Sequence, residues 1–169
     1  MSRKSKLKKQ QTAFIMIGHV GVGKSTWAKF KTSTSHNLIR ISKDDIRAMI
    51  NGRYEYVEEL EELVKSMAQR SMLAALHSGF DVVLDECHLT RKIRHDICIT
   101  LKTVFPDIKI VYVYVHCNIS MAMGRRKQDP MGHPPLYWEF ISKTHQAVFQ
   151  EPTSDEEFVD EMMEIYNEQ

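Results

Sequence analysis

The segment 18–25 constrains the fold of this chain more than any other. It reads Gly-His-Val-Gly-Val-Gly-Lys-Ser and fits the pattern G-x-x-x-x-G-K-[ST]. An apolar stretch, 13–17, precedes it, and a helix-forming stretch, 24–31, follows it. This order predicts a strand, a phosphate-binding loop and a helix, a unit that belongs to α/β domains.

The residues of the loop fit this chemistry. Glycine at three positions lets the backbone curl so that its N–H groups point at phosphate oxygens, and the following helix adds its positive N-terminal dipole. Lys24 is expected to reach the β- and γ-phosphates as a catalytic cation, and the Ser25 hydroxyl to ligate Mg²⁺. The expected nucleotide-binding residues are Gly18, His19, Val20, Gly21, Val22, Gly23, Lys24, Ser25 and Thr26. The expected cofactors are ATP and Mg²⁺.

The rest of the chain alternates apolar stretches with segments of helical spacing. Strands are predicted at 13–17, 38–41, 82–84 and 108–115, and helices at 24–31, 44–50, 57–76 and 93–105. This alternation predicts an α/β fold with a largely parallel sheet that helices cover on both faces. Without a Gly/Ser- or Pro-rich linker, residues 12–169 are expected to form one α/β domain around the phosphate-binding loop. The basic segment 1–11 is expected to be a flexible extension.

A basic helix and a breaker cluster follow the last strong strand. Residues 118–127 have helical spacing and end in Arg125, Arg126 and Lys127. The sequence QDPMGHPP then interrupts the chain before a helix at 136–149. This arrangement fits a helical lid at about 118–135. From spacing alone, an ordinary surface hairpin fits equally well.

Charge and cysteine content exclude several classes. The formal net charge is +1, but residues 1–10 hold five basic groups and no acid, whereas 151–169 hold eight acids and no base. The three cysteines, Cys87, Cys98 and Cys117, form neither a disulfide framework nor a zinc pattern. No apolar run approaches the roughly 20 residues that cross a bilayer. We therefore expect a cytoplasmic protein without a membrane partner.

The remaining motifs favour a small kinase. A GTPase would carry an N-K-x-D guanine reader, which is absent. Residues 82–86 resemble a Walker B strand, in which the Asp helps to hold Mg²⁺ and the Glu activates water. Asp85 and Glu86 therefore leave an ATPase function open. Asp44 is a candidate general base, and Arg47, three residues on, shares its helix face. A helix-capping role explains Asp45 better than it explains Asp44. Spacing alone leaves open whether Asp44 is the catalytic base or simply an acid at the start of a helix.

These motifs, taken in order, resemble a known family. The segments that match are Gly23-Lys24-Ser25-Thr26-Trp27-Ala28, Asp44-Asp45 with Arg47, Tyr54-Glu55-Tyr56, Asp85, Arg125-Arg126, His133-Pro134-Pro135 and Pro152-Thr153. The chain resembles the 5′-kinase domain of phage polynucleotide kinase-phosphatase, within a group that also contains zeta toxins. The resemblance covers about 12–165, and Trp27 and the Tyr-x-Tyr pair are its more specific parts.

The resemblance implies roles for the site residues. Asp44 would be the general base, Arg47 would bind the phosphate beside the acceptor nucleoside, and Asp85 would orient Arg47. Arg125 and Arg126 would be the lid arginines that stabilise the transferred phosphoryl group. The family's second lid arginine lies a few residues further on, where this chain has Gln128 and Asp129, so Arg126 or Lys127 would replace it. The resemblance also implies a last strand at 158–165, whereas charge alone favours an acidic tail.

The leading hypothesis is therefore a kinase that phosphorylates 5′-hydroxyl ends of DNA or RNA. Two alternatives stay open, a zeta-toxin-like kinase of small molecules or nucleotides and a P-loop ATPase switch. Because the phosphatase domain of the family is absent, processing of 3′ ends would need a separate protein. The sequence leaves a homo-oligomer open. It also leaves open whether Tyr54 and Tyr56 stack on acceptor bases or pack at a helix start.

Overall fold

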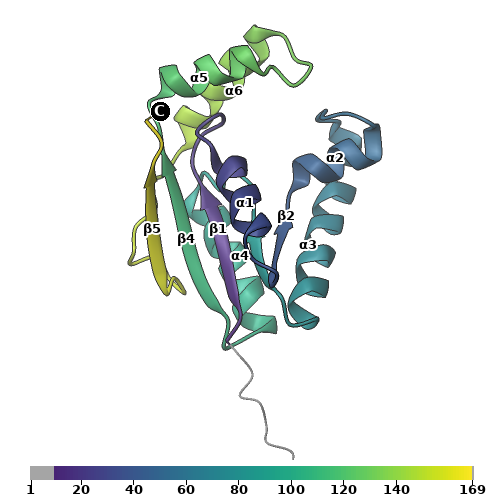
Figure 1. The fold of residues 1–169 in the computed structure, drawn as a ribbon, viewed down its shortest axis with the longest axis vertical. Helices are drawn as coiled ribbons and strands as arrows, with labels where there is room; N and C mark the ends of the chain where they lie inside the picture. The colour runs from purple at the N-terminus through teal and green to yellow at the C-terminus, as the bar shows by residue number, and fades with distance from the viewer. Residues whose placement is uncertain (1–9, 169) are drawn as a thin grey trace, which may run out of the picture.

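A computed structural model describes residues 10–168 and has a parallel sheet at its centre (Figure 1). The strands are β1 (Thr12–Ile17), β2 (Leu38–Ile41), β3 (Asp81–Leu84), β4 (Lys109–His116) and β5 (Glu161–Tyr166). Their order is β2-β3-β1-β4-β5, and every neighbouring pair is parallel. The predicted α/β fold is confirmed. The carboxyl ends of the strands, which bear the loops of interest, therefore share one edge.

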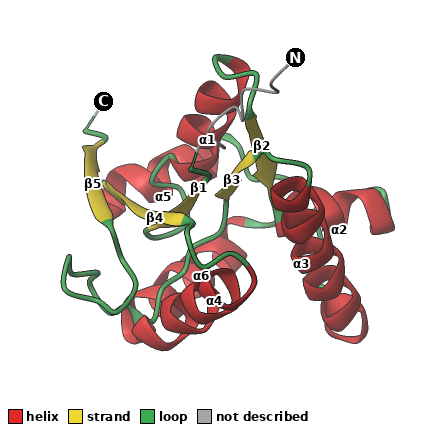
Figure 2. Cartoon of the chain, turned by 90° about the horizontal axis from the view of Figure 1, so that it is seen from below, coloured by secondary structure: helices red, strands yellow, loops and turns green. Residues whose placement is uncertain are grey.

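Helices flank the sheet and cover one end of it. They are α1 (Lys24–Ser33), α2 (Lys43–Asn51), a 3₁₀ turn η1 (Glu58–Leu60), α3 (Glu61–His77), α4 (Arg91–Val104), α5 (Ile119–Gln128) and α6 (Pro135–Val148). Helix α1 lies on one face, and α3 and α4 lie on the other (Figure 2). Helices α5 and α6 lie above the carboxyl ends of the strands (Figure 1).

The central strands are buried on both faces, which explains their continuous apolar runs. Successive side chains of a strand point to opposite faces. Ile15 belongs to the core cluster that includes residues of α3 and α4, and Met16 to the cluster that includes Ala28 of α1. Both are fully buried, and burying such a side chain stabilises the fold by about 1.5–3 kcal/mol. The sheet is thus a rigid base for the loops at its carboxyl edge.

The acidic end of the chain is part of the fold. Strand β5 confirms the last strand that the resemblance implies, although it starts at Glu161, and the expectation of an acidic tail from charge alone is wrong. Upstream of it, Glu156 is buried and pairs with the fully buried Arg94 at 2.5 Å. A buried carboxylate is stable there because a guanidinium neutralises it.

The expected flexible segment 1–11 lies mostly outside the described residues, which exclude 1–9. Its last residue, Gln11, donates side-chain hydrogen bonds to the carbonyls of Leu76 (2.8 Å) and Phe80 (2.7 Å), so this residue is anchored to the domain. Within the described chain, no helix combines the length and the apolar character that crossing a membrane requires.

Candidate active site

The loop between β1 and α1 has backbone angles that glycine adopts without strain and other residues rarely adopt. Gly18 and Gly21 have φ of 140° and 79°. A Cβ atom at Gly18 would lie 2.7 Å from the carbonyl oxygen of Val115, and one at Gly21 would lie 2.5 Å from that of Ala122 in α5. Real Cβ atoms essentially never come this close. Glycine at 21 is therefore required by the contact with α5 as well as by the backbone angle.

Lys24 lies at the first position of α1 and is buried. Its Nζ donates to the carbonyl oxygens of Gly18 at 2.9 Å and His19 at 2.5 Å. The loop's own backbone thus holds the ammonium group at the loop. A cation in this place is suited to bind the phosphates of a nucleotide.

Ser25, Asp85 and Arg40 form a chain of hydrogen bonds at the end of β3. The Ser25 hydroxyl donates to Asp85 Oδ1 at 3.1 Å, and Arg40 Nε donates to Asp85 Oδ2 at 2.7 Å. The expected contact between Asp85 and Arg47 is therefore wrong. Arg40 takes that place because β2 and β3 are adjacent and parallel, with Arg40 in register with Val83. Arg40 is the one charged residue of an otherwise apolar predicted strand, and this was the signal in the sequence that could have identified it as the partner of Asp85.

The site has oxygen donors that suit Mg²⁺. The Ser25 hydroxyl and the Asp85 carboxylate lie together, and Mg²⁺ is typically bound by one or two carboxylates with substrate phosphates and water. The described residues contain no group of three or more His, Cys, Asp or Glu side chains that could hold a metal. The residues present therefore fit an ion that is held largely by the nucleotide phosphates.

Asp44 and Arg47 meet on one side of α2, and Glu61 of α3 completes the group. Arg47 Nη1 donates to Asp44 Oδ1 at 2.7 Å, while Nε and Nη2 donate to the two oxygens of Glu61 at 2.6 and 2.7 Å. These hydrogen bonds hold the pKa of Glu61 below its usual range. Sequence reasoning missed Glu61; the available signal was an acidic residue four positions after Val57 and three before Val64, on the apolar side of the predicted helix.

The structure separates Asp44 from its neighbour Asp45. The Ser42 side chain caps α2 by accepting the backbone N–H of Asp45, and the Asp45 carboxylate pairs with Arg40. Asp44 has no part in the cap, and 43% of its side chain is exposed. Its partial removal from water raises its pKa, Arg47 opposes the shift, and the negative charge of Asp85 adds to it. A carboxylate with a raised pKa is a better proton acceptor near neutral pH.

Glu86, the residue that a Walker B interpretation would assign to water activation, forms an ion pair. Its Oε2 lies 2.7 Å from Lys43 Nζ, and both side chains are only about a quarter exposed. The Glu86 carboxylate is thus already engaged by a cation of α2.

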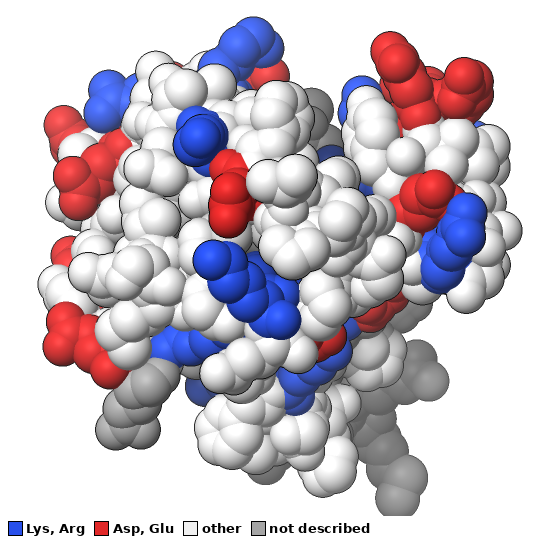
Figure 3. All heavy atoms as spheres, turned by 90° about the horizontal axis from the view of Figure 1, so that it is seen from above, with Lys and Arg blue, Asp and Glu red and all other residues white. Residues whose placement is uncertain are grey.

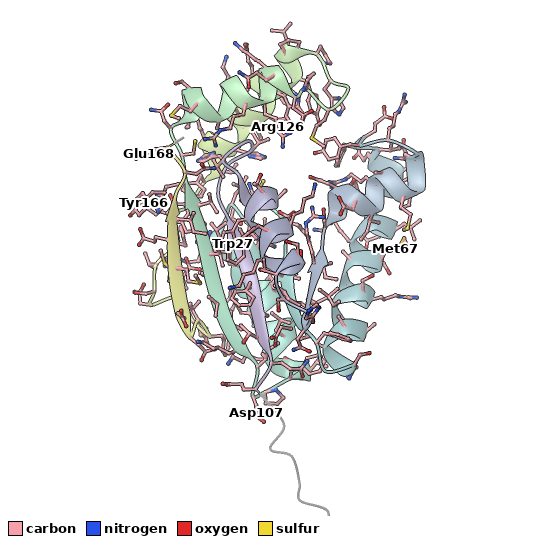
Figure 4. All side chains as sticks on the ribbon, viewed as in Figure 1. Trp27, Met67, Asp107, Arg126, Tyr166 and Glu168 are labelled. Atoms are coloured by element: carbon pink, nitrogen blue, oxygen red, sulfur yellow. The ribbon has the colours of Figure 1, made fainter. Side chains whose placement is uncertain are left out.

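The two adjacent arginines of α5, expected to be lid arginines, have different surroundings. Arg126 lies on the side of α5 that faces the rest of the molecule (Figure 4). Its guanidinium is 4.7 Å from the ring centre of Trp138, and its buried Nε has no hydrogen-bond partner within the described chain. Arg125 contacts Cys117 Sγ at 3.5 Å and the carbonyl oxygen of Asn167 at 3.3 Å. Neighbours in the sequence are thus separated by the helical rotation of α5.

The loop between α5 and α6 reaches the connection between α2 and α3. His133 Nε2 lies 3.2 Å from the Tyr54 carbonyl oxygen, and the Tyr54 ring stacks on Trp138 at 6.2 Å. Tyr56 is instead 57% exposed, with the Arg47 guanidinium 5.9 Å from its ring centre. The two tyrosines, for which the sequence left packing and stacking open, are therefore in different environments.

Helix α6 also touches the phosphate loop. The backbone N–H of Val20 donates to His145 Nδ1 at 3.3 Å. Burial, together with the nearby charge of Lys24, lowers the pKa of His145 to about 4, so the ring is neutral at pH 7 and can accept this hydrogen bond.

The surface seen from above the carboxyl ends of the strands carries charges of both signs (Figure 3). Basic side chains stand near the middle of this face, and acidic ones lie mostly toward its margins. The face suits an anionic substrate.

Comparisons with known proteins agree with this architecture. The uncharacterized protein PM0531 of Pasteurella multocida (strain Pm70) is 29% identical over 104 residues, which cover 59% of this chain and 52% of that protein. A solved structure of the Pnkp1/Rnl/Hen1 RNA repair complex is similar with a TM-score of 0.67 and 22% identity, over 87% of this chain and 48% of the other. A fungal RNA kinase is similar with a TM-score of 0.68 and 15% identity, over 95% and 76%.

At these identities, the likeness to the solved structures shows the shared fold. The chain spans about half the length of the curated relative that it matches. The model of the AAA_33 family, described as an AAA domain, matches residues 14–131, which include the phosphate loop, α2 and α5. Because the family model matches well over half of this chain, the chain belongs to the AAA_33 family of AAA domains, and it is a nucleotide-binding P-loop domain that shares the fold of these structures.

Proposed function

We propose that the chain transfers the γ-phosphoryl group of ATP to the 5′-hydroxyl end of DNA or RNA in the presence of Mg²⁺. The observation that carries this proposal is the Asp44–Arg47–Glu61 group at the same edge of the sheet as the phosphate loop. It combines a proton acceptor with a fixed cation. A hydroxyl that adjoins a phosphate, as at a polynucleotide end, requires both.

Arg47 has donors left for an acceptor phosphate. A guanidinium carries five N–H donors, and the hydrogen bonds to Glu61 and Asp44 use three of them. Glu61 fixes the plane of the fork, so the remaining donors have a defined direction. The phosphate beside the acceptor nucleoside would bind there and place the 5′-hydroxyl against Asp44.

The transfer would proceed by in-line displacement. The 5′-oxygen forms a bond to the γ-phosphorus, the bond from that phosphorus to the bridging oxygen breaks, and ADP leaves. Asp44 accepts the proton of the hydroxyl, while Lys24 and Arg126 stabilise the charge of the phosphoryl group. Mg²⁺, held by Ser25 and Asp85 with the nucleotide phosphates, would supply further charge neutralisation.

Two further observations bear on the competing functions. The ion pair of Glu86 with Lys43 disfavours an ATPase in which Glu86 activates water. RNA is a substrate to be tested because one structural relative is a fungal RNA kinase and another comes from an RNA repair complex.

The test uses ATP labelled at the γ-phosphate, Mg²⁺ and 5′-hydroxyl oligonucleotides of DNA and RNA. Asp44→Asn should reduce kcat by roughly 10²–10⁴-fold, because it removes the base without changing the size of the side chain. Asp45→Asn makes the same chemical change one residue away and should remain within a few-fold of wild type. No label on either oligonucleotide, or equal rates for wild type and Asp44→Asn, would overturn the proposal. Label on a free nucleotide alone would support a small-molecule kinase.

A further inference from the structure

Asn167 follows β5 and lies at the carboxyl edge of the sheet. Its backbone N–H donates to the carbonyl oxygen of His116, the last residue of β4, at 2.9 Å, which continues the hydrogen bonding between the two strands. This end of β5 lies beneath α5 (Figure 1). The sheet thus fixes the backbone of Asn167 close to the place where α5 touches the phosphate loop.

The side chain of Asn167 contacts the phosphate loop. Its Nδ2 donates to the carbonyl oxygen of Val22 at 2.8 Å, across 145 positions in the chain. Val22 is only 1% exposed, so water has almost no access to this carbonyl. The fit is close, because a Cβ atom at Gly23 would overlap Asn167 Nδ2. The third glycine of the loop therefore leaves room for the Asn167 amide.

The same side chain accepts a hydrogen bond from α5. Arg125 Nη2 lies 3.4 Å from Asn167 Oδ1 and 3.3 Å from the Asn167 carbonyl oxygen. A backbone carbonyl only accepts hydrogen bonds and a guanidinium only donates them, so these partners determine which end of the amide faces each. Asparagine suits this place because one short side chain supplies both a donor and an acceptor. Aspartate would lack the donor, and alanine would lack both.

The contact with Arg125 restricts the rotation of α5. Successive residues of an α-helix lie about 100° apart around its axis, since about 3.6 residues make one turn. Holding Arg125 toward the end of β5 therefore sets the direction in which Arg126 leaves the helix. Arg126 lies beside the phosphate loop, because its Cγ would be 3.3 Å from a Cβ atom at Gly21. Asn167 is thus connected to the loop directly and to Arg126 through its neighbour.

We propose that Asn167 is a positioning residue, which holds the phosphate loop in its binding conformation and, through Arg125, directs Arg126 toward the transferred phosphoryl group. The second part rests on the proposed function, in which Arg126 stabilises the charge of that group. Arg125 is then the anchor of α5, and Arg126 is its catalytic arginine. The two contacts of Asn167 make separate predictions, one for the binding of ATP and one for the rate of transfer.

The contact with the loop is tested by the Kd of a fluorescent ATP analogue. Asn167→Asp keeps an oxygen for Arg125 but has no N–H for the Val22 carbonyl. A loop that relaxes to hydrate this carbonyl must be restored when ATP binds, so Kd should rise by roughly 5- to 150-fold, the equivalent of one buried acceptor left unsatisfied. Asn167→Ala, which adds no charge, should raise Kd to a similar extent, and it serves alone if Asn167→Asp does not fold.

Asn118 provides the matched control for this binding experiment. Its Oδ1 accepts the backbone N–H of Ser120 at 2.8 Å, at the start of α5, and an aspartate can accept the same hydrogen bond. Asn118→Asp therefore makes the same chemical change without losing a partner, and its Kd should stay within a few-fold of wild type. A Kd for Asn167→Ala that equals that of Asn118→Asp would overturn the contact with the loop.

The contact with α5 is tested by kcat at saturating ATP with a 5′-hydroxyl oligonucleotide. Asn167→Ala and Arg125→Met both remove this contact, and each should lower kcat by roughly 10- to 150-fold, the equivalent of one hydrogen bond to a charged group. Asn167→Asp retains the contact and should stay within a few-fold of wild type. A change of KM alone in Asn167→Ala would overturn the positioning of Arg126.

A second genetic background separates positioning from a general loss of stability. If Asn167 acts on the rate through Arg126, adding Asn167→Ala to Arg126→Ala should lower kcat by less than about two-fold, because the arginine to be positioned is gone. A side chain that only stabilises the fold would lower kcat by the same factor in both backgrounds. That result would overturn the proposal.

Hydrogen exchange keeps the test independent of the proposed function. If no oligonucleotide is phosphorylated, the kinase proposal fails, and the exchange of backbone amides in residues 18–25 and 119–128 still reports on the two contacts. Faster exchange of both segments in Asn167→Ala, with that of α3 unchanged, supports the anchoring of the loop and α5 by Asn167. Exchange that equals wild type, or that is faster by the same factor in α3, overturns it.

Discussion

Replacing Gly21 by alanine tests whether the lid rests on the phosphate loop. The motif leaves position 21 variable, so the pattern alone does not require glycine there. In the structure, Gly21 has φ of 79°, and an added Cβ would lie 2.5 Å from the Ala122 carbonyl oxygen and 3.3 Å from Arg126 Cγ. Both neighbours belong to α5. The alanine variant must therefore strain the backbone and also displace the lid.

The two effects can be separated by magnitude. A left-handed backbone angle costs about 1–2 kcal/mol for a residue with a Cβ atom. Overpacking against neighbouring atoms adds about 1–3 kcal/mol. Gly79 has φ of 89° with nothing within 4 Å of an added Cβ, so Gly79→Ala has only the first cost. We expect a loss of roughly 2–5 kcal/mol for Gly21→Ala and about 1–2 kcal/mol for Gly79→Ala.

Urea unfolding of both variants and wild type measures these free energies of unfolding. In a chain of this size, each kcal/mol lowers Tm by about 2–4 °C, so thermal unfolding gives a second reading. Equal losses in the two variants would show that α5 does not press on the loop and would refute the steric argument. A larger loss in Gly21→Ala, accompanied by weaker ATP binding, would support it.

Two further predictions concern the buried ion pair and the lid. Glu156→Gln should destabilise the fold by about 3–5 kcal/mol in urea unfolding, because it leaves the fully buried Arg94 without its partner. Burial alone would raise the pKa of Glu156, but the hydrogen bond from Arg94 outweighs it and holds this pKa below its ordinary 4.5. The stabilisation from the pair should therefore be present above about pH 4.5 and decline as the pH falls below that value. The same pH dependence of unfolding in wild type and Glu156→Gln would contradict this prediction. Arg126→Ala should lower kcat by roughly 100-fold or more, whereas Lys127→Ala, whose side chain is 58% exposed, should change it little; the reverse order in the labelled-ATP assay would assign the lid's catalytic cation to Lys127.

Much of the fold follows from local patterns. The phosphate loop, the strands and the helices depend on residues that are close together in the chain, since glycine placement, apolar runs and helical spacing act over a few positions. The last strand, β5, was harder to predict because it lies at the edge of the sheet and carries two exposed acidic residues, Glu161 and Glu164. A pattern of charge could not distinguish that strand from a tail.

The partners of the site residues could not be read from the chain. Asp85 binds Arg40, 45 residues away, because β2 and β3 are neighbours, and Arg47 binds Glu61, 14 residues away, because α2 and α3 meet. Sequence patterns specify which chemical groups each element carries. The packing of distant elements selects which of those groups meet, because hydrogen bonds and ion pairs act over a few ångströms in space and not along the chain.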